Sequence, residues 1–544
     1  MDILFVDKPA GVTTHTSLGT AETERAGLFR EINDGFCEHL AARSGQKLYV
    51  SHRLDRDTTG CIVFATSPES AEVLRERFAT HKVSKRYLFL TTQNGLRGEE
   101  FTAESFIERR GSTYVSSSHT AANSRTGFKL LNASEGLFLW EARPETGKPH
   151  QIRLHAADAG MPILGDQDHG GASFTTLCLH SESLRVQVDG QDDLVFSQPP
   201  PRWFLDLELT KNPLLMRWLV AIDRRERLLR SWAACGDHSM SAKDVNRLAD
   251  ERTLRWLHSE ADPLRADQLG PLVWLMWFRE RHPNPLELQT IEKLASVLGW
   301  QSWALQLRID RGGASSNPLI EAAGSCKPPA NWLARENGLT FEMRAEQGLS
   351  SGLFLDQRQN RAWVQRNAKQ KTVLNLFCYS GGFSVAAAKG GATRVVSVDL
   401  SKNFLEWTKS NFQHNGLTLE NHEFRAIDSR EYLAWAKKKG LTFDIVICDP
   451  PSFSRSDKGI FKIERDLEQL LTALIAVTNN DGGRVLFSSN FESWDDAEFE
   501  ARVRSFAKTD QRLRLDRTPS PDWDFELPNT ARIMKSFFIC YETR

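Results

Sequence analysis

The chain has 544 residues and a formal net charge of −1, from 69 Lys and Arg against 70 Asp and Glu. This length exceeds what one hydrophobic core usually serves, so we expect about two to four domains. No apolar run approaches the ~18–20 residues of a membrane-spanning helix, and the eight cysteines include no Cys-x-x-Cys pair, which argues against a zinc site or a disulfide framework.

The first residues bear on where the protein resides. Residues 1–6 carry no basic region ahead of their short apolar run, so we expect no signal peptide. Scattered cysteines without a pairing pattern are typical of reduced thiols. Together these features favour a cytoplasmic protein.

Residues 1–205 have the pattern of a sheet-rich α+β domain with a mixed sheet. Apolar runs at 61–65 and 87–90 predict strands, and residues 69–80 predict a helix. The domain ends at Pro199-Pro200-Pro201, because consecutive prolines can continue neither a helix nor a central strand.

The middle of the chain is divided by pattern into a helical linker at 206–248 and a small α+β domain at 249–345. Amphipathic helices are expected at 213–234 and 286–298, and the Gly- and Ser-rich stretch 312–318 predicts a loop. Periodicity alone indicates a spacer and docking role for this part of the chain.

Residues 346–544 alternate between apolar strands and amphipathic helices. Strands are expected at 373–377, 394–398 and 443–448, and helices at 384–389 and 404–415. Nearly continuous apolar strands alternating with helices predict a doubly wound parallel sheet of the Rossmann-like α/β class.

The N-terminal domain contains four sequence motifs in a characteristic order. They are Asp7-Lys8-Pro9-Ala10-Gly11, the loop from His52 to Gly60, Lys85-Arg86-Tyr87, and the segment from Glu145 to His155 that is followed by Gly165-Asp166. Residues 1 to about 200 resemble the RluA-type pseudouridine synthases, without the S4 RNA-binding domain that many relatives carry in front.

The resemblance implies a reaction that needs no cofactor and a role for each of four residues. Asp55 is expected to be the catalytic aspartate, and Arg153 is expected to pair with it. Tyr87 would stack on the target base, and Arg53 would fill the gap left by the flipped nucleotide. The chain departs from the family at Lys148-Pro149, where Arg-Thr is usual, and at Ser181, where Ala is common.

The C-terminal domain carries polar residues where a parallel sheet binds its ligands. Gly381 and Gly382 follow the first strand and allow close approach of the backbone. Asp399 ends the second strand, where an acid can accept hydrogen bonds from ribose hydroxyls, and Asp428 would meet an adenine amino group. The run Asp449-Pro450-Pro451-Ser452-Phe453 is a rigid turn after a buried strand, and Asp449 and nearby carbonyls there can accept hydrogen bonds from a base.

Residues 345–544 resemble S-adenosylmethionine (SAM)-dependent 23S rRNA methyltransferases, and most of all their guanine-N7, RlmK-like branch. The resemblance rests on Gly352-Leu353-Phe354-Leu355-Asp356-Gln357-Arg358, on the segment from Asn375 to Ser380 and on Phe487-Ser488-Ser489-Asn490. It implies a set of SAM-binding residues: Asp356, Arg358, Asn375, Phe377, Tyr379, Gly381, Gly382, Asp399, Asp428 and Asp449. It also implies a set that holds the substrate base: Pro450, Pro451 and Phe453.

The sister branch of that family makes 5-methylcytosine, and its reaction needs a cysteine thiolate to attack the base. This chain has Ser488, Ser489 and Asn490 in the matching segment. Cys448 precedes Asp449 but lies in an apolar strand, where we expect a buried, inert thiol. Guanine N7 needs only placement against the methyl group, so the missing cysteine favours N7.

The fusion of the two domains favours a bifunctional enzyme acting on one RNA, expected to be 23S rRNA or its large-subunit precursor. Three alternatives stay open: 5-methylcytosine as the product, tRNA as the substrate, or an RNA-binding ribosome-assembly factor with one inactive site. We expect neither a membrane nor a metal partner. The net charge of −1 does not reveal an RNA surface, since RNA binders are commonly basic.

Overall fold

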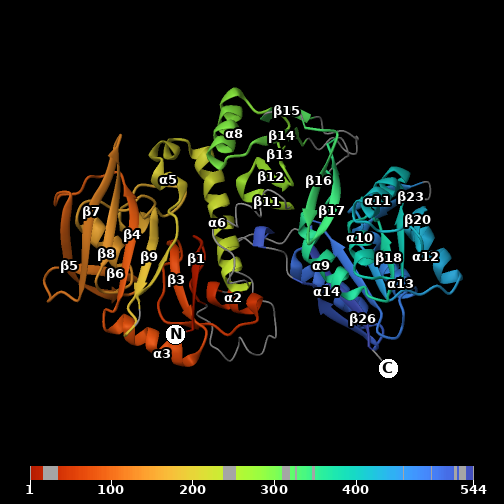
Figure 1. Cartoon of the computed structure of the whole chain (residues 1–544), viewed down its shortest axis with the longest axis horizontal. Coiled ribbons are helices and arrows are strands. Elements are labelled where there is room, and N and C mark those ends of the chain that lie inside the picture. Colours follow the sequence, from red (N-terminus) through yellow and green to blue (C-terminus); the bar gives the residue numbers. More distant parts are fainter. Residues whose placement is uncertain are drawn as a thin grey trace.

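The computed structural model describes residues 2–15, 35–190, 192–236, 253–308, 319–324, 328–345, 350–456, 459–491, 493–519, 523–525 and 534–542. Three bodies follow one another along the long axis of the molecule (Figure 1). The predicted loop at 312–318 lies outside the described residues. In the described part of the chain, no helix has the length and apolar character needed to cross a membrane.

The N-terminal body is built on a ten-stranded mixed sheet, which confirms the predicted α+β class. Its spatial order is β1-β3-β9-β4-β8-β7-β5-β6, with β2 on β3 and β10 on β9. The strands are β1 (Ile3–Lys8), β2 (Tyr49–Val50), β3 (Thr59–Ala65), β4 (Val83–Thr91), β5 (Glu100–Arg110), β6 (Thr113–Ser117), β7 (Ser124–Ser134), β8 (Leu137–Pro144), β9 (Leu179–Val186) and β10 (Leu194–Ser197). The helices are α2 (Phe36–Ser44), α3 (Pro68–Ala79) and α4 (Gln151–Asp158).

The local sequence explains where these elements begin and end. The predicted helix at 69–80 is α3, which Ser67 caps by accepting a hydrogen bond from the backbone N–H of Ser70. The three prolines 199–201 separate β10 from α5 (Arg202–Leu205) and the 3₁₀ turn η3 (Leu207–Lys211), as expected.

The described part of the middle body contains a five-stranded sheet, the helix α8 and a hairpin. The sheet order is β11-β12-β13-β14-β15, and β16 pairs with β17. Asn284 and Glu287 form a capping box at the start of the helix. The elements are β11 (Thr253–Leu257), η4 (Ser259–Ala261), β12 (Leu264–Leu269), β13 (Leu272–Trp277), α8 (Pro285–Leu298), β14 (Ser302–Leu307), β15 (Leu319–Gly324), β16 (Asn331–Glu336) and β17 (Leu339–Arg344).

Strand β13 shows how the middle body joins its neighbours. All of its six residues are buried. Val273, Leu275 and Trp277 belong to the core shared with the N-terminal body. The alternate residues Leu272, Trp274 and Met276 belong to the core shared with the C-terminal body. Since successive side chains of a strand point to opposite faces, one sheet contributes to two hydrophobic cores.

The C-terminal body is the predicted doubly wound sheet. Its order is β20-β19-β18-β21-β24-β26-β25, with β26 antiparallel to β24 and β25. The strands are β18 (Thr372–Leu376), β19 (Arg394–Asp399), β20 (His422–Ala426), β21 (Ile445–Cys448), β24 (Arg484–Ser489), β25 (Leu513–Arg517) and β26 (Lys535–Tyr541). The other elements are η5 (Leu355–Gln357), α9 (Arg358–Asn367), α10 (Gly382–Lys389), α11 (Lys402–His414), α12 (Ser429–Lys438), β22 (Phe453–Ser456), β23 (Gly459–Lys462), α13 (Ile463–Ile475), α14 (Asp496–Ala507) and η6 (Trp523–Phe525).

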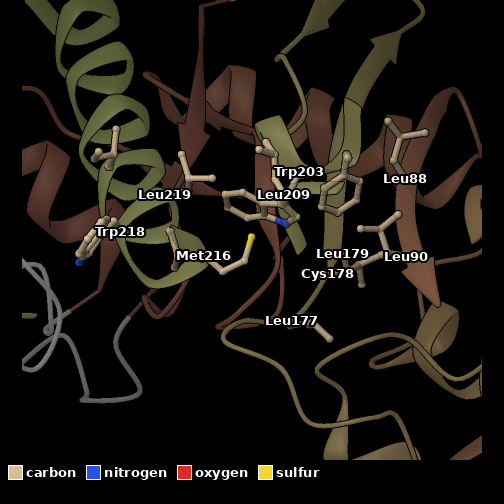
Figure 2. Packing of buried hydrophobic residues seen from close by; sticks show 14 of the residues in the cluster. Leu88, Leu90, Leu177, Cys178, Leu179, Trp203, Leu209, Met216, Trp218 and Leu219 are labelled. Carbon is tan, nitrogen blue, oxygen red and sulfur yellow. The ribbon is translucent and has the colours of Figure 1, made fainter. Parts of the chain in front are cut away.

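The long helix α6 (Pro213–Gly236) corresponds to the helix predicted at 213–234. It stands between the N-terminal sheet and the middle sheet (Figure 1). Its Met216 and Leu219 face Trp203 and Leu179 in one continuous buried cluster (Figure 2). The part of the predicted linker that the structure describes is therefore packed as a core element, because its apolar stripe is covered from both sides.

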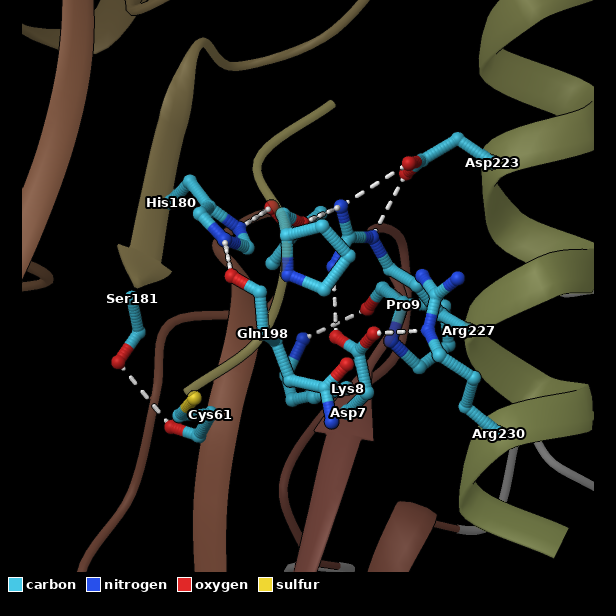
Figure 3. A network of polar contacts seen from close by, with 12 residues as sticks. Asp7, Lys8, Pro9, Cys61, His180, Ser181, Gln198, Asp223, Arg227 and Arg230 are labelled. Carbon is cyan, nitrogen blue, oxygen red and sulfur yellow. Dashed lines mark hydrogen bonds and ion pairs between the residues drawn. The ribbon is translucent and has the colours of Figure 1, made fainter. Parts of the chain in front are cut away.

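A buried ion-pair cluster ties α6 to strand β1 (Figure 3). The Asp7 carboxylate is fully buried and accepts hydrogen bonds from Arg227 at 2.6 Å and Arg230 at 2.8 Å. Arg227 also donates to Asp223, at 2.7 and 2.9 Å. The Ser231 hydroxyl lies 3.0 Å from the Asp7 N–H and 2.8 Å from its carbonyl. A buried carboxylate with two guanidinium partners fixes the register between helix and strand.

Replacing Arg227 by Gln should destabilise the N-terminal body by about 3–5 kcal/mol, because the Asp7 charge is left buried with a single partner. Urea unfolding of the full chain would measure the loss. Arg110→Gln is the matched control, since that arginine is exposed and pairs with Glu108 at 2.7 Å, and it should cost less than about 1 kcal/mol. Equal stability of the two variants would contradict the role of the cluster.

Candidate functional sites

Asp55 and Arg153 meet in the wall of a cavity of about 420 Å³. The Oδ2 atom of Asp55 lies 3.5 Å from Nη1 of Arg153. Tyr87 lines the same cavity from β4, and burial raises the pKa of its hydroxyl. The structure therefore brings together three of the residues that the sequence predicted for one site.

The carboxylates of Asp166 and Asp168 hold the Arg153 guanidinium in place, a role that the sequence did not predict. Its Nε and Nη2 atoms donate to the fully buried Asp166 at 2.8 and 2.6 Å, and Nη2 donates to Asp168 at 3.1 Å. Burial opposes the charge of Arg153, but the Asp166 carboxylate more than offsets this effect and raises its pKa. Asp166 follows Gly165 in the last of the four N-terminal motifs, and this was its only signal in the sequence.

The loop that carries Asp55 is fixed by Lys8, at the end of β1. The buried Lys8 ammonium donates to the carbonyls of Arg56 at 2.8 Å and Thr58 at 3.0 Å, and both residues follow Asp55 in the loop. Burial lowers the pKa of Lys8 to about 7. Since Asp7 is its neighbour in β1, the ion-pair cluster on α6 and the Asp55 loop are parts of one rigid assembly.

Arg53 is the exposed member of the predicted set. It lines the Asp55 cavity and also a second cavity of about 480 Å³, whose wall includes Asp57 and Asp168. The described residues provide no hydrogen-bond partner for its guanidinium. Its exposed position in the walls of both cavities is compatible with the predicted insertion into a nucleic-acid stack.

In the C-terminal body, the loop after β18 is held in a strained conformation. Phe377 and Tyr379 have φ values of 53° and 50° in the left-handed region, which costs non-glycine residues about 1–3 kcal/mol each. Gly381 has φ 79°, and a Cβ atom there would lie 2.3 Å from Cγ2 of Thr408. Backbone strain of this kind is typical of functional loops.

Asp399, at the end of β19, binds this loop. Its Oδ2 atom accepts a hydrogen bond from the Tyr379 N–H at 3.0 Å, and Oδ1 accepts one from the Ser401 N–H at 2.9 Å. Burial raises the pKa of Asp399. The glycine loop and the acid that were predicted from their spacing therefore lie in direct contact.

Two acidic residues, Asp356 and Asp449, act on each other at the end of β21. The Nε2 atom of Gln357 donates to Oδ2 of Asp449 at 2.9 Å. Burial, together with the nearby charge of Asp356, raises the pKa of Asp449 to about 7. The segment 352–358 and the Asp449 turn, which are separate motifs in the sequence, thus form one site.

Three predicted SAM-binding side chains are engaged elsewhere. The guanidinium of Arg358 is buried and bound by Asp524 at 2.8 Å and by the Thr253 carbonyl at 2.6 Å, so it joins the middle and C-terminal bodies rather than lining the site. The Asn375 amide is buried and donates to Ser384 at 2.9 Å, which makes its side chain part of the strand packing. The Asp428 carboxylate caps α12.

The predicted base-binding turn is only partly described. Pro450 is buried and Pro451 is exposed, whereas the side chain of Phe453 lies outside the described residues. Cys448 is fully buried in β21, and burial raises the pKa of its thiol well above the ordinary value. Ser488 and Ser489 are buried in the neighbouring strand β24. A thiol needs access to the base and its thiolate form to act as a nucleophile, and burial of Cys448 opposes both.

Comparisons with known proteins agree with this two-part arrangement. The family model described as S-adenosylmethionine-dependent methyltransferase matches residues 246–519, and the model described as RNA pseudouridylate synthase matches residues 2–158. The first match begins at the middle body and extends through most of the C-terminal body.

Curated relatives match parts of the chain. Identity to YwbD of Bacillus subtilis is 37% over 207 residues, covering 38% of this chain and 50% of that protein. Identity to the ribosomal RNA large subunit methyltransferase K of Neisseria meningitidis serogroup B is 36% over 242 residues, covering 43% and 67%. The methyltransferase K/L of Marinobacter nauticus is 37% identical over 183 residues, covering 32% and 25%. The chain thus spans about half of the first relative and a quarter of the third.

The raised pKa of Asp449 predicts a pH-dependent stability. The Asp449 carboxyl group has a pKa of about 7 in the folded protein, against the ordinary value of 3.8. Its contribution to the stability of the fold is therefore fully present at a pH below its ordinary pKa and is lost as the pH rises to about 7. Asp449→Asn should therefore gain stability relative to the parent chain between about pH 4 and 7, by up to about 1.4 kcal/mol per pH unit.

Chemical denaturation of both proteins across this range would measure the difference. Asp192→Asn provides the control, since it makes the same substitution at an exposed position. A difference for Asp449→Asn that does not change with pH would show that this carboxyl titrates normally.

Proposed function

The chain belongs to the S-adenosylmethionine-dependent methyltransferase family and carries an N-terminal RNA pseudouridylate synthase domain, and from this premise we propose that it is a bifunctional RNA-modifying enzyme. It isomerises uridine to pseudouridine in one site and methylates a base in the other. The observation that carries the proposal is that one chain holds both assemblies: Asp55, Arg153 and Tyr87 around one cavity, and Asp399 and Asp449 at the ends of parallel strands.

In the first site, the isomerisation breaks the bond from uracil N1 to ribose C1′ and joins the base again through C5. Asp55 is the carboxylate that acts near C1′, and Arg153 pairs with it and orients it. Tyr87 packs against the loosened base from the cavity wall. The nucleotide must leave its stack, at a cost of about a few kcal/mol, and Arg53 at the cavity mouth takes the vacated place.

In the second site, the donor set fits a SAM molecule. The Asp399 carboxylate can accept hydrogen bonds from ribose hydroxyls, and the loop around Gly381 lets the backbone approach the ligand. Bound SAM supplies an electrophilic methyl group. The substrate base is placed by Asp449, whose carboxyl group is oriented by Gln357.

We infer that the methylated atom is guanine N7. This nitrogen attacks through a lone pair, so the protein needs to remove no proton and to supply no thiolate, and placement of the base suffices. The buried Cys448 and the serines 488 and 489 support this inference against 5-methylcytosine.

We propose large-subunit ribosomal RNA as the substrate and the cytoplasm as the location. Two of the relatives are named as ribosomal RNA large subunit methyltransferases, which supports rRNA over tRNA. An assembly factor with one inactive site is the less favoured candidate, because Arg153 and its buried support Asp166 are both present around Asp55.

Asp55→Asn should abolish pseudouridine formation while leaving methyl transfer at its normal rate, because the two sites share no catalytic group. Nucleoside analysis of RNA treated with the purified variant and SAM would measure both products. Asp57→Asn is the matched control in the same loop, where the carboxylate pairs with Arg56 at 3.2 Å. Normal pseudouridine formation by Asp55→Asn would refute the assignment.

Asp399→Ala should weaken SAM binding by more than about tenfold, because hydrogen bonds to a carboxylate contribute about 1.5–3 kcal/mol, and it should keep pseudouridine formation. Calorimetry with SAM checks the binding, with Asp510→Ala as the control at an exposed turn.

Nucleoside analysis of RNA treated with the parent enzyme and SAM identifies the methylated nucleoside. Finding 5-methylcytidine without 7-methylguanosine would overturn the N7 proposal.

A further inference from the structure

The wall of the Asp55 cavity contains a lysine, Lys85, which stands two residues before Tyr87 on β4. Side chains at every second position of a strand share a face, so Lys85 and Tyr87 project from the same side of the sheet. Arg86 between them binds the buried Glu141 on the other side. The cavity that Tyr87 bounds therefore has an ammonium group in its wall as well.

The charge of Lys85 is compensated by no carboxylate among the described residues. Its ammonium forms no ion pair with them. The cavity wall contains two carboxylates, those of Asp55 and Glu145. Asp55 pairs with Arg153, and Glu145 accepts a hydrogen bond from Arg125 at 3.0 Å. Burial lowers the pKa of Lys85 to about 8, so the ammonium is still mostly protonated at pH 7.

The neighbours of the ammonium leave it donors for a ligand. Nζ of Lys85 donates to the Thr146 carbonyl at 3.2 Å, and a Cβ atom at Gly147 would lie 3.5 Å from it. An ammonium carries three N–H donors, so two remain for a molecule in the cavity. His52, also in the wall, adds no charge, because burial and the charge of Lys85 lower its pKa to about 3.

The isomerisation itself creates a negative charge in this cavity. When the bond from N1 to C1′ breaks, its electron pair leaves with the base, and the uracil becomes an anion whose charge is shared by N1, O2 and O4. The bond from C5 to C1′ then forms from an electron pair of this anion, and the C5 proton passes to N1. A cation that is fixed in place beforehand lowers the barrier, because the charge it binds exists only after cleavage begins.

We propose that Lys85 binds O4 of the target uracil and stabilises the uracil anion, which makes it a further catalytic residue of the isomerase site. The inference rests on the proposed function. A base stacked on Tyr87 with C1′ at Asp55 has O4 on the side of the ring opposite N1, away from Asp55, and the Lys85 ammonium forms no ion pair with that carboxylate. A donor at this position also rejects cytosine, which carries an amino group in place of O4.

The first test is the rate of pseudouridine formation in a 23S rRNA transcript with enzyme in saturating excess. Lys85→Met keeps the length of the side chain without its charge and should slow the reaction on the order of a hundredfold. Lys85→Gln retains a neutral donor for the Thr146 carbonyl and should also be slow. Lys129→Met is the matched control, because Lys129 is exposed, pairs with Glu100 at 3.9 Å and lies outside the cavity wall. The parent's rate in Lys85→Gln would show that the charge is not used.

A second measurement separates contact with O4 from a structural role. A transcript made from a mixture of uridine and 4-thiouridine triphosphates lets the two bases compete at the same position, and the sulfur of the thiobase accepts a weaker hydrogen bond than O4. The ratio of pseudouridine to 4-thiopseudouridine should be several-fold higher for the parent than for Lys85→Met. Equal ratios would show that Lys85 does not contact O4, and the inference would be wrong.

The remaining outcomes distinguish the inference from its premise. If Lys85→Met weakens RNA binding and reduces its salt dependence while the saturating rate stays unchanged, the ammonium binds a phosphate, and the inference is wrong although the proposed function stands. If the parent chain forms no pseudouridine in the transcript, the proposed function and the inference fall together.

Discussion

The structure depends on one buried carboxylate. Asp7 is fully buried at the end of β1 and is bound by Arg227 and Arg230 of α6. Because breaking such a cluster leaves an unpaired charge in the interior, helix and strand have one favourable register. Lys8, the next residue, holds the Asp55 loop through its carbonyls. The position of α6 and the shape of the first site are therefore set together.

The same helix extends this constraint to the other half of the molecule. Arg225 donates to the Asp524 carbonyl at 3.0 Å and also binds Glu260 of the middle body. The Asp524 side chain in turn binds Arg358, which follows Gln357, the partner of Asp449. Buried polar contacts thus connect both sites to one helix. With the two cores that meet in β13, they make the three bodies a single scaffold, as the proposed modification of one RNA in two sites requires.

Much of the fold and of both sites could be predicted from the sequence, because the signals were local. Period-two and helical patterns located β3, α3, α6 and β18, and motif order located Asp55 and Arg153. The sequence did not predict contacts between residues that are far apart in the chain. Asp7 and Arg227 are 220 residues apart, so no periodicity joins them. Arg358 was predicted to line the SAM site, whereas its guanidinium binds Asp524 in the structure. A motif fixes where the backbone lies but not where a long side chain points.

The central claim is that one chain makes both modifications in one RNA. Mapping pseudouridine and 7-methylguanosine across 23S rRNA from a strain that lacks this gene tests it most directly. The account predicts that one pseudouridine and one 7-methylguanosine disappear together and that both return with the intact gene. Persistence of either modification at its normal level, or loss of only one of them, would contradict the claim.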